Sequence, residues 1–148
     1  MRILIVLSFL AVSIVAHAAD WGIPSDSLEK ALPKECDASA DAGLYDCAAK
    51  AYQQADAELN AVWKKALAAI DQNNPDAPAG LTAAQIGEWK NDLIAAQKAW
   101  VAFKDIDCNQ ARSFEYWGGS ARSLAVLSCQ YEYTIGRTND LKERYLGR

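Results

Sequence analysis

Hydrophobic and polar residues follow a helical rhythm over a long stretch of this chain, from Leu81 to Phe114. One stripe repeats every three or four residues and consists of Trp89, Leu93, Ala96, Trp100, Phe103, Asp107, Gln110 and Phe114. Positions with this spacing lie on one face of an α-helix. An amphipathic helix of roughly thirty residues needs partner helices to cover its apolar face. The pattern therefore predicts a central helix around which the rest of the chain packs.

Two further segments have the same rhythm and predict the partner helices. The first begins at Ser39 or Asp41, either of which can act as N-cap, and its apolar stripe is Leu44, Ala48, Ala51, Ala55, Leu59, Val62, Ala66 and Ala69. The other begins at Ser120, with the stripe Leu124, Leu127, Tyr131, Thr134, Thr138, Leu141 and Tyr145. Short connections favour antiparallel neighbours. We expect an all-α fold, a small antiparallel three-helix bundle.

The connections between these helices have their own sequence signals. Segment 71–80 contains two prolines and one glycine, which end a helix and form a loop. Thr82 and Gln85 have the spacing of a capping box at the start of the central helix. The pair Gly118-Gly119 breaks the helical pattern before the last helix.

The segment 1–18 has the pattern of a signal peptide. An apolar run over residues 3–15 follows a basic residue, and Ala16-His17-Ala18 places small residues where a signal peptidase cuts. The run is shorter than the about twenty residues of a membrane span. We expect cleavage after Ala18, an irregular arm over 19–38 and a helical domain over 39–148. The protein would then be periplasmic or secreted, without stable membrane insertion.

Removal of this segment also removes His17, the single histidine of the chain. Without histidine the mature chain has no Ser-His-Asp, Cys-His or imidazole-zinc arrangement, so we expect no enzyme, no cofactor and no metal site. Loss of Arg2 changes the formal net charge from −4 to −5, because fourteen of fifteen basic residues remain against nineteen acidic ones. This acidity disfavours nucleic acid and suits a basic protein partner, or it serves solubility alone.

Four cysteines, Cys36, Cys47, Cys108 and Cys129, lie in the mature part. An even number in an exported chain predicts two disulfides that staple the bundle and its arm. Helical register places Cys47, Cys108 and Cys129 at one end of the bundle, with Cys36 within reach. Three pairings are possible, and loop-closure entropy mildly favours long-range bridges over a bridge between Cys36 and Cys47.

Acidic residues interrupt the central stripe near its end. Asp105 and Asp107 could form the acid pair of a glycoside hydrolase, but residues two apart on a helix point away from each other. We favour a structural role, in which Lys104, Asp105 and Asp107 form a partly buried polar network with Arg137, or with Arg122, of the last helix.

The corner between the last two predicted helices is the candidate partner-binding site. It consists of Tyr116, Trp117, Gly118, Gly119 and Ser120. Aromatic residues on a rigid corner are typical of binding hot spots, although Trp117 could instead close the end of the core. The acidic loop 71–80 is a second candidate for partner contact.

The residues taken together resemble a known family. The pattern consists of Cys36, Cys47, Ala55-Asp56, Leu59-Asn60, Ala96-Gln97, Trp100, Lys104-Asp105, Asp107-Cys108, Gly118-Gly119-Ser120, Cys129, Thr134, Arg137 and Leu141. It is similar to the LprI-type lysozyme inhibitor domain of exported bacterial proteins, except that Lys104 stands where that family typically has arginine. The resemblance implies a protein that inhibits lysozyme or a related peptidoglycan hydrolase by occluding its cleft. The alternative is a non-enzymatic periplasmic cell-envelope protein with another protein partner.

Overall fold

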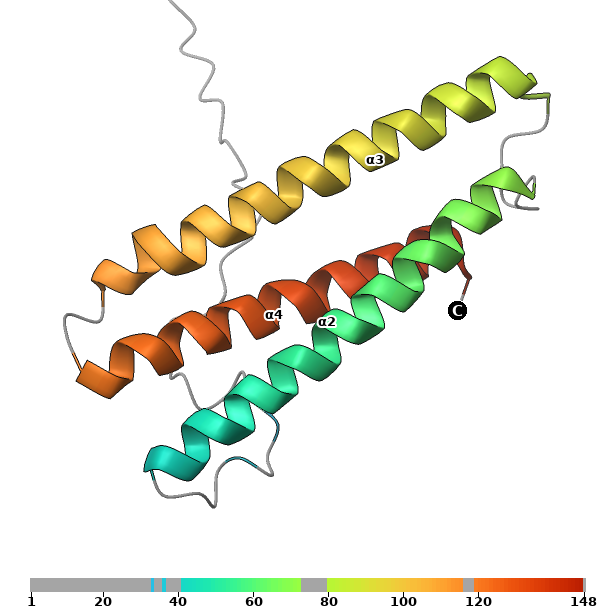
Figure 1. The fold of residues 1–148 in the computed structure, drawn as a ribbon. Helices are drawn as coiled ribbons and strands as arrows, with labels where there is room; N and C mark the ends of the chain where they lie inside the picture. Colours follow the sequence, from blue (N-terminus) through green and yellow to red (C-terminus); the bar gives the residue numbers. More distant parts are fainter. Residues whose placement is uncertain (1–32, 34–35, 37–40, 73–79, 116–118, 148) are drawn as a thin grey trace, which may run out of the picture.

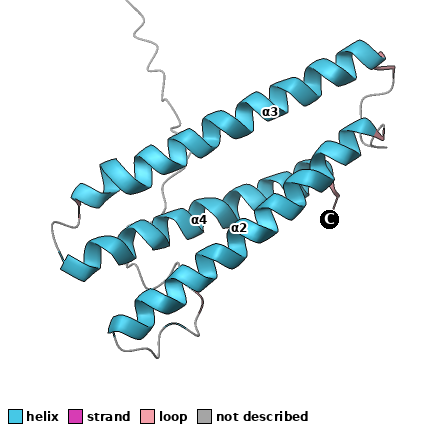
Figure 2. Ribbon diagram, in the orientation of Figure 1, coloured by secondary structure: helices cyan, strands magenta, loops and turns pink. Residues whose placement is uncertain are grey.

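Three long helices form the described part of the chain. The structure is a computed structural model that describes residues 33, 36, 41–72, 80–115 and 119–147. The helices are α2 (Asp41–Asp71), α3 (Ala83–Ile106) and α4 (Gly119–Tyr145). α2 and α4 run in the same direction and α3 runs against both (Figure 1), and nearly all of the described residues are helical (Figure 2). The predicted all-α three-helix bundle is confirmed, whereas segment 1–18 and most of the arm lie outside the described residues.

The start of α3 shows how local sequence sets a helix boundary. Thr82 is the N-cap, and its hydroxyl oxygen accepts a hydrogen bond from the backbone N–H of Gln85 at 3.3 Å. In return, the backbone N–H of Thr82 donates to the side-chain oxygen of Gln85 at 2.9 Å. These two bonds satisfy N–H groups that a helix start would otherwise leave unpaired. The predicted capping box is confirmed.

The core lies mainly between α2 and α4, which are in close contact along their lengths, while α3 contacts both sparingly. Buried residues from α2 include Ala48, Ala51, Ala55, Leu59, Val62, Ala66 and Ile70, and those from α4 include Thr134, Thr138, Leu141 and Tyr145. On α3 only Leu93 and Lys104 are buried. Figure 1 shows α3 standing apart from the other two helices. The prediction that the chain packs around segment 81–114 is therefore wrong.

Side-chain size explains this arrangement. Small alanines on α2 and the threonines on α4 let these two helices approach closely. The buried hydroxyls need no partner from another helix, because Thr134 Oγ1 donates to the carbonyl of Gln130 at 2.7 Å and Thr138 Oγ1 to that of Thr134 at 2.8 Å. α3 carries the larger rings of Trp89 and Trp100 on the side that packs against the core, and these hold it farther from the other two helices.

Much of the stripe predicted for the central helix is exposed. Phe103 and Phe114 are 52% and 63% exposed, and Ala96 and Gln110 are exposed as well. Leu93 belongs to the main core cluster, against which Trp89 and Trp100 pack. The stripe is thus core near its start and becomes surface toward Phe114.

The sequence pattern predicted one regular α-helix as far as Phe114, and the structure differs from this. α3 ends at Ile106 and is followed by a π-helical turn, η2 (Asp107–Ala111), and a 3₁₀ turn, η3 (Arg112–Phe114). The π turn contains Cys108, which forms a disulfide with Cys129 of α4. Short π-helical turns of this kind often occur at functional sites.

The second disulfide joins Cys36 to Cys47, with 5.6 Å between their Cα atoms. The preference for longer-range bridges is therefore wrong. Cys36 is fully buried beside Ala48 of α2, and its backbone N–H donates to the carbonyl of Pro33 at 2.9 Å. A local turn thus places Cys36 against the first turns of α2, and this proximity outweighs the small entropic advantage of a longer loop.

Candidate partner-binding surface

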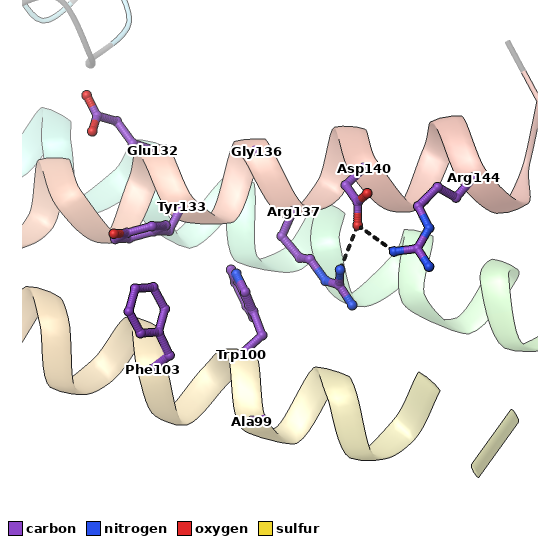
Figure 3. Close-up of a pocket in the computed structure, with 9 residues that line it drawn as sticks. All are labelled: Ala99, Trp100, Phe103, Glu132, Tyr133, Gly136, Arg137, Asp140 and Arg144. Carbon is purple, nitrogen blue, oxygen red and sulfur yellow. Dashed lines mark hydrogen bonds and ion pairs between the residues drawn. The ribbon is translucent and has the colours of Figure 1, made fainter. Parts of the chain in front are cut away.

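A groove lies where α3 passes over one side of α4, and we call it the α3–α4 groove. Its volume is about 740 Å³, and it is lined by Ala99, Trp100, Phe103, Glu132, Tyr133, Gly136, Arg137, Asp140 and Arg144. Figure 3 shows Trp100 and Phe103 pointing from α3 toward α4, and Tyr133 and Arg137 pointing back toward α3. A volume of this size suits a small-molecule ligand or a side-chain cluster of a partner.

Aromatic rings form one half of the groove. Phe103 and Tyr133 pack edge to face, with ring centroids 5.5 Å apart. The guanidinium of Arg112 lies 5.6 Å from the ring centroid of Tyr133. Trp100 is also near cations, because the guanidinium of Arg137 lies 6.0 Å from its ring centroid. These cation–π contacts hold the rings in fixed orientations.

Charged groups form the other half. Arg137 Nη1 donates to Asp140 Oδ2 at 2.6 Å, and Arg144 Nη1 reaches the same oxygen at 3.4 Å. The side chain of Arg137 is only 11% exposed, and its Nε donates to the amide oxygen of Gln97 on α3 at 2.9 Å. Arg137 therefore ties α3 to α4 and presents a preorganised guanidinium to the groove.

The π turn supplies a second connection between the helices. Asp107 Oδ2 accepts hydrogen bonds from Tyr133 Oη at 2.9 Å and from Arg112 Nε at 3.1 Å. Burial raises the pKa of Tyr133, and the bond to Asp107 raises it further, because that bond needs the phenolic proton. Burial also raises the pKa of Glu132, and the positive charge of Arg112 partly opposes the shift.

The predicted network of Lys104, Asp105, Asp107 and Arg137 is divided between separate sites. Asp107 forms an ion pair with Arg112 of its own segment. Arg122 and Arg137, the partners predicted for it, bond to Ser113 and Gln97 instead, so the predicted pairing is wrong. The π turn causes this difference, because it turns the Asp107 side chain toward Tyr133 and Arg112.

Lys104 lies on the other side of α3, facing α2, and is 4% exposed. Its Nζ donates to Tyr52 Oη at 3.0 Å and lies 3.8 Å from the carboxylate of Asp105. The rings of Tyr52 and Trp100 are close enough for cation–π contact, at 5.2 and 5.6 Å. Lys104 thus joins α3 to α2, as Arg137 joins it to α4.

Exposed apolar side chains gather on the C-terminal half of α3 and the turns after it. Of six large hydrophobic side chains that are exposed in the described part of the chain, four are Val101, Phe103, Ile106 and Phe114, and we call these the α3 ridge. Ile106 is 56% exposed. Phe103 also lines the α3–α4 groove, and Val101, two positions before it, points to another side of α3. Exposed apolar side chains of this kind can take part in interactions.

The corner predicted to bind a partner adjoins this ridge in sequence. Tyr116, Trp117 and Gly118 lie outside the described residues, and Gly119 and Ser120 begin α4 without described side chains. Most of the acidic loop, residues 73–79, also lies outside them. Both assignments remain predictions.

Asp107, Cys108 and Cys129 place three possible metal ligands within 4.8 Å of one another. Both sulfur atoms belong to the disulfide, so the oxidised protein offers a metal ion only the Asp107 carboxylate at this point. None of the described helices is long and apolar enough to span a membrane.

Of the α4 residues that line the groove, only Arg137 was named from the sequence, as part of the polar network and of the family pattern. Tyr133, Arg137, Asp140 and Arg144 follow a second three-four rhythm on α4, beside the stripe that faces α2. Because this second stripe is mostly charged, it has the pattern of a solvated surface. The spacing of these four residues was the one sequence signal for this face of α4, and it does not show that α3 lies beside that face.

Comparison with known proteins gives a consistent result. Residues 34–141 match the family described as Lysozyme inhibitor LprI. The chain is also 37% identical over 97 residues to "Uncharacterized protein R02472" of Rhizobium meliloti (strain 1021), an alignment that covers 66% of this chain and 68% of that protein. No solved structure matches the chain.

Proposed function

Because this chain belongs to the LprI family of lysozyme inhibitors, we propose that it is an exported binding protein that inhibits lysozyme or a related peptidoglycan hydrolase. It acts by occluding the cleft of the enzyme and performs no reaction itself. The family match over residues 34–141 is the observation that carries this proposal. It includes both disulfides, the whole of α2 and α3, and α4 as far as Leu141.

The α3 ridge is the surface proposed to contact the hydrolase, together with the adjoining corner 116–120. The ridge lies on the helix that packs least closely in the bundle, and its four side chains are exposed to a partner. Its exposed side chains lose water contact on binding, which is favourable by about 25 cal/mol for each Å² of apolar area.

Several contacts hold the ridge in one conformation before binding. The Cys108–Cys129 bridge fixes its end to α4, and the hydrogen bond from Lys104 to Tyr52 fixes its base to α2. A preorganised surface loses less conformational entropy when it binds. The net charge, −4 for the full chain and −5 without segment 1–18, also favours association with a basic hydrolase.

The test is lysis of bacterial cell walls by lysozymes of several classes, in the presence of the oxidised protein expressed from Ala19. Val101→Ser and Ile106→Ser remove exposed apolar area from the ridge and should weaken inhibition and binding at least tenfold. Tyr45→Ser is the matched control, because Tyr45 is 46% exposed on α2; it should leave inhibition unchanged.

Two outcomes would overturn parts of the proposal. Inhibition that the ridge variants do not weaken would exclude the ridge as the contact surface. Absence of inhibition and binding across the whole panel would exclude the inhibitor function and favour the alternative, a periplasmic cell-envelope protein with another partner.

A further inference from the structure

We infer that the α3–α4 groove is a binding site for a sugar ring that carries a carboxylate, the chemistry of N-acetylmuramic acid in peptidoglycan fragments. The choice of a cell-wall sugar rests on the proposed function, which places the protein at the cell wall. The requirement for a ring and a carboxylate comes from the groove itself. Nothing in this inference requires the α3 ridge to bind a hydrolase.

The arginine half of the groove has an excess of positive charge. Arg137 and Arg144 share the single carboxylate of Asp140, so the three groups together carry one net positive charge. Arg137 uses Nε on Gln97 and Nη1 on Asp140, and its Nη2 has no hydrogen-bond partner among the described residues. Arginine pairs strongly with carboxylates through two parallel N–H donors. A ligand carboxylate would therefore complete this half of the site.

The aromatic half provides a surface for a ring. Trp100, Phe103 and Tyr133 line it, and the apolar faces of sugars pack on such side chains in ligand pockets. Two small residues, Ala99 and Gly136, also line the groove. A Cβ atom added at Gly136 would meet nothing within 4 Å, so the ligand can approach the backbone of α4 there.

The carboxylate of Glu132 lies at the other end of the groove. Glu132 is five positions before Arg137 and twelve before Arg144 on α4, which is roughly 8 and 18 Å along a helix, and in Figure 3 its side chain points away from α3. Its repulsion of an anionic ligand is therefore weak at the arginine end. A cationic ligand would meet two guanidiniums there and is disfavoured.

The experiment compares two sugars that share a ring and differ in the lactyl carboxylate, N-acetylmuramic acid and N-acetylglucosamine. Binding is followed by chemical-shift changes of the oxidised protein, expressed from Ala19, during titration with each sugar. We expect N-acetylmuramic acid to bind at least tenfold more tightly, with the largest shifts in Trp100 and Arg137. Added salt should reduce this preference, because it screens the charge pair.

One variant tests access to the groove, and a second tests its arginine half. Gly136→Leu places a side chain in the groove while removing a helix-interior glycine, so the variant should fold and lose binding of the acid at least tenfold. Arg144→Gln should reduce the preference for the acid at least fivefold. Lys98→Gln is the matched control, because it removes the same charge from an exposed position on α3; the preference should persist.

Equal affinity for the two sugars, no binding of either at 20 mM, or unchanged binding by a folded Gly136→Leu variant would each overturn the inference. The lysozyme assay separates it from the proposed function. Sugar binding without inhibition would support the groove site and exclude the inhibitor function. Inhibition that Gly136→Leu abolishes, in a protein that binds neither sugar, would overturn the sugar site and assign the groove to the hydrolase.

Discussion

Removal of the Cys108–Cys129 bridge tests how α3 is held against the other helices. The bridge closes a loop with a sequence separation of 21, against 11 for Cys36–Cys47. Chain entropy gives a loss of about 3 kcal/mol for replacing Cys108 and Cys129 with alanine, and the two bridges should differ by about 0.6 kcal/mol. If loop length were the whole effect, the two double variants would behave almost alike.

The structure predicts a further, local difference between the two bridges. α3 has two buried residues, Leu93 and Lys104, whereas α2 and α4 bury a row of side chains against each other. Without the bridge, the end of α3 keeps its polar contacts and the partly buried Trp100, but loses its covalent attachment to α4. We therefore expect segment 94–106 to open locally before the molecule unfolds.

Urea unfolding and native-state hydrogen exchange measure the two effects. The variant without the Cys108–Cys129 bridge should lose about 3 kcal/mol of unfolding free energy, and amides of segment 94–106 should exchange at least tenfold faster than amides of 134–141. Replacement of Cys36 and Cys47 by alanine is the control and should leave that ratio as in the wild type. Equal protection of the two segments after loss of the Cys108–Cys129 bridge would refute the reasoning, because packing alone would then hold α3.

Three other predictions concern stability. Tyr52→Phe should destabilise the protein by about 1–3 kcal/mol in urea unfolding, because Lys104 loses a buried hydrogen-bond acceptor, whereas Tyr45→Phe at an exposed position should have no effect. Burial raises the pKa of Glu132 above 4.5, so the stabilising contribution of this group is present below that pH and is lost as the pH rises through its folded-state pKa. The Glu132→Gln variant should therefore be more stable than the wild type by a larger margin at pH 7 than at pH 4 in urea unfolding. An equal margin at both pH values would contradict the raised pKa. Gly87→Ala should raise stability by about 0.5–1 kcal/mol in thermal unfolding, because the added methyl meets no atom within 4 Å, and a lower melting temperature would exclude this explanation.

The resemblance to the LprI family came from sequence order alone, and the match over residues 34–141 confirms it. The order of the cysteines, the glycines and the Lys104-Asp105 pair along the chain can be compared with a family without knowing which residues are in contact. The partner-binding corner 116–120 was also proposed from the sequence, but its contacts depend on the partner protein, so this assignment remains a prediction. The groove was missed because its two walls come from different helices.

Local interactions explain what the sequence determined by itself. Helix periodicity, the Thr82 capping box and the buried face of α2 depend on residues within a few positions of one another, and the structure has all three. The same reasoning identified the face of α4 that contains Thr134 and Leu141.

Tertiary structure alone decided which helices approach closely and what their second faces do. A hydrophobic pattern gives the polarity of a face but not the distance at which another helix can pack. Here the alanines of α2 and the threonines of α4 allow close contact, so the strongest aromatic stripe, on α3, remains at the edge with Phe103 half exposed. The Cys108–Cys129 bridge and the α3–α4 groove depend on that choice of neighbours, because each requires residues from two different helices to meet.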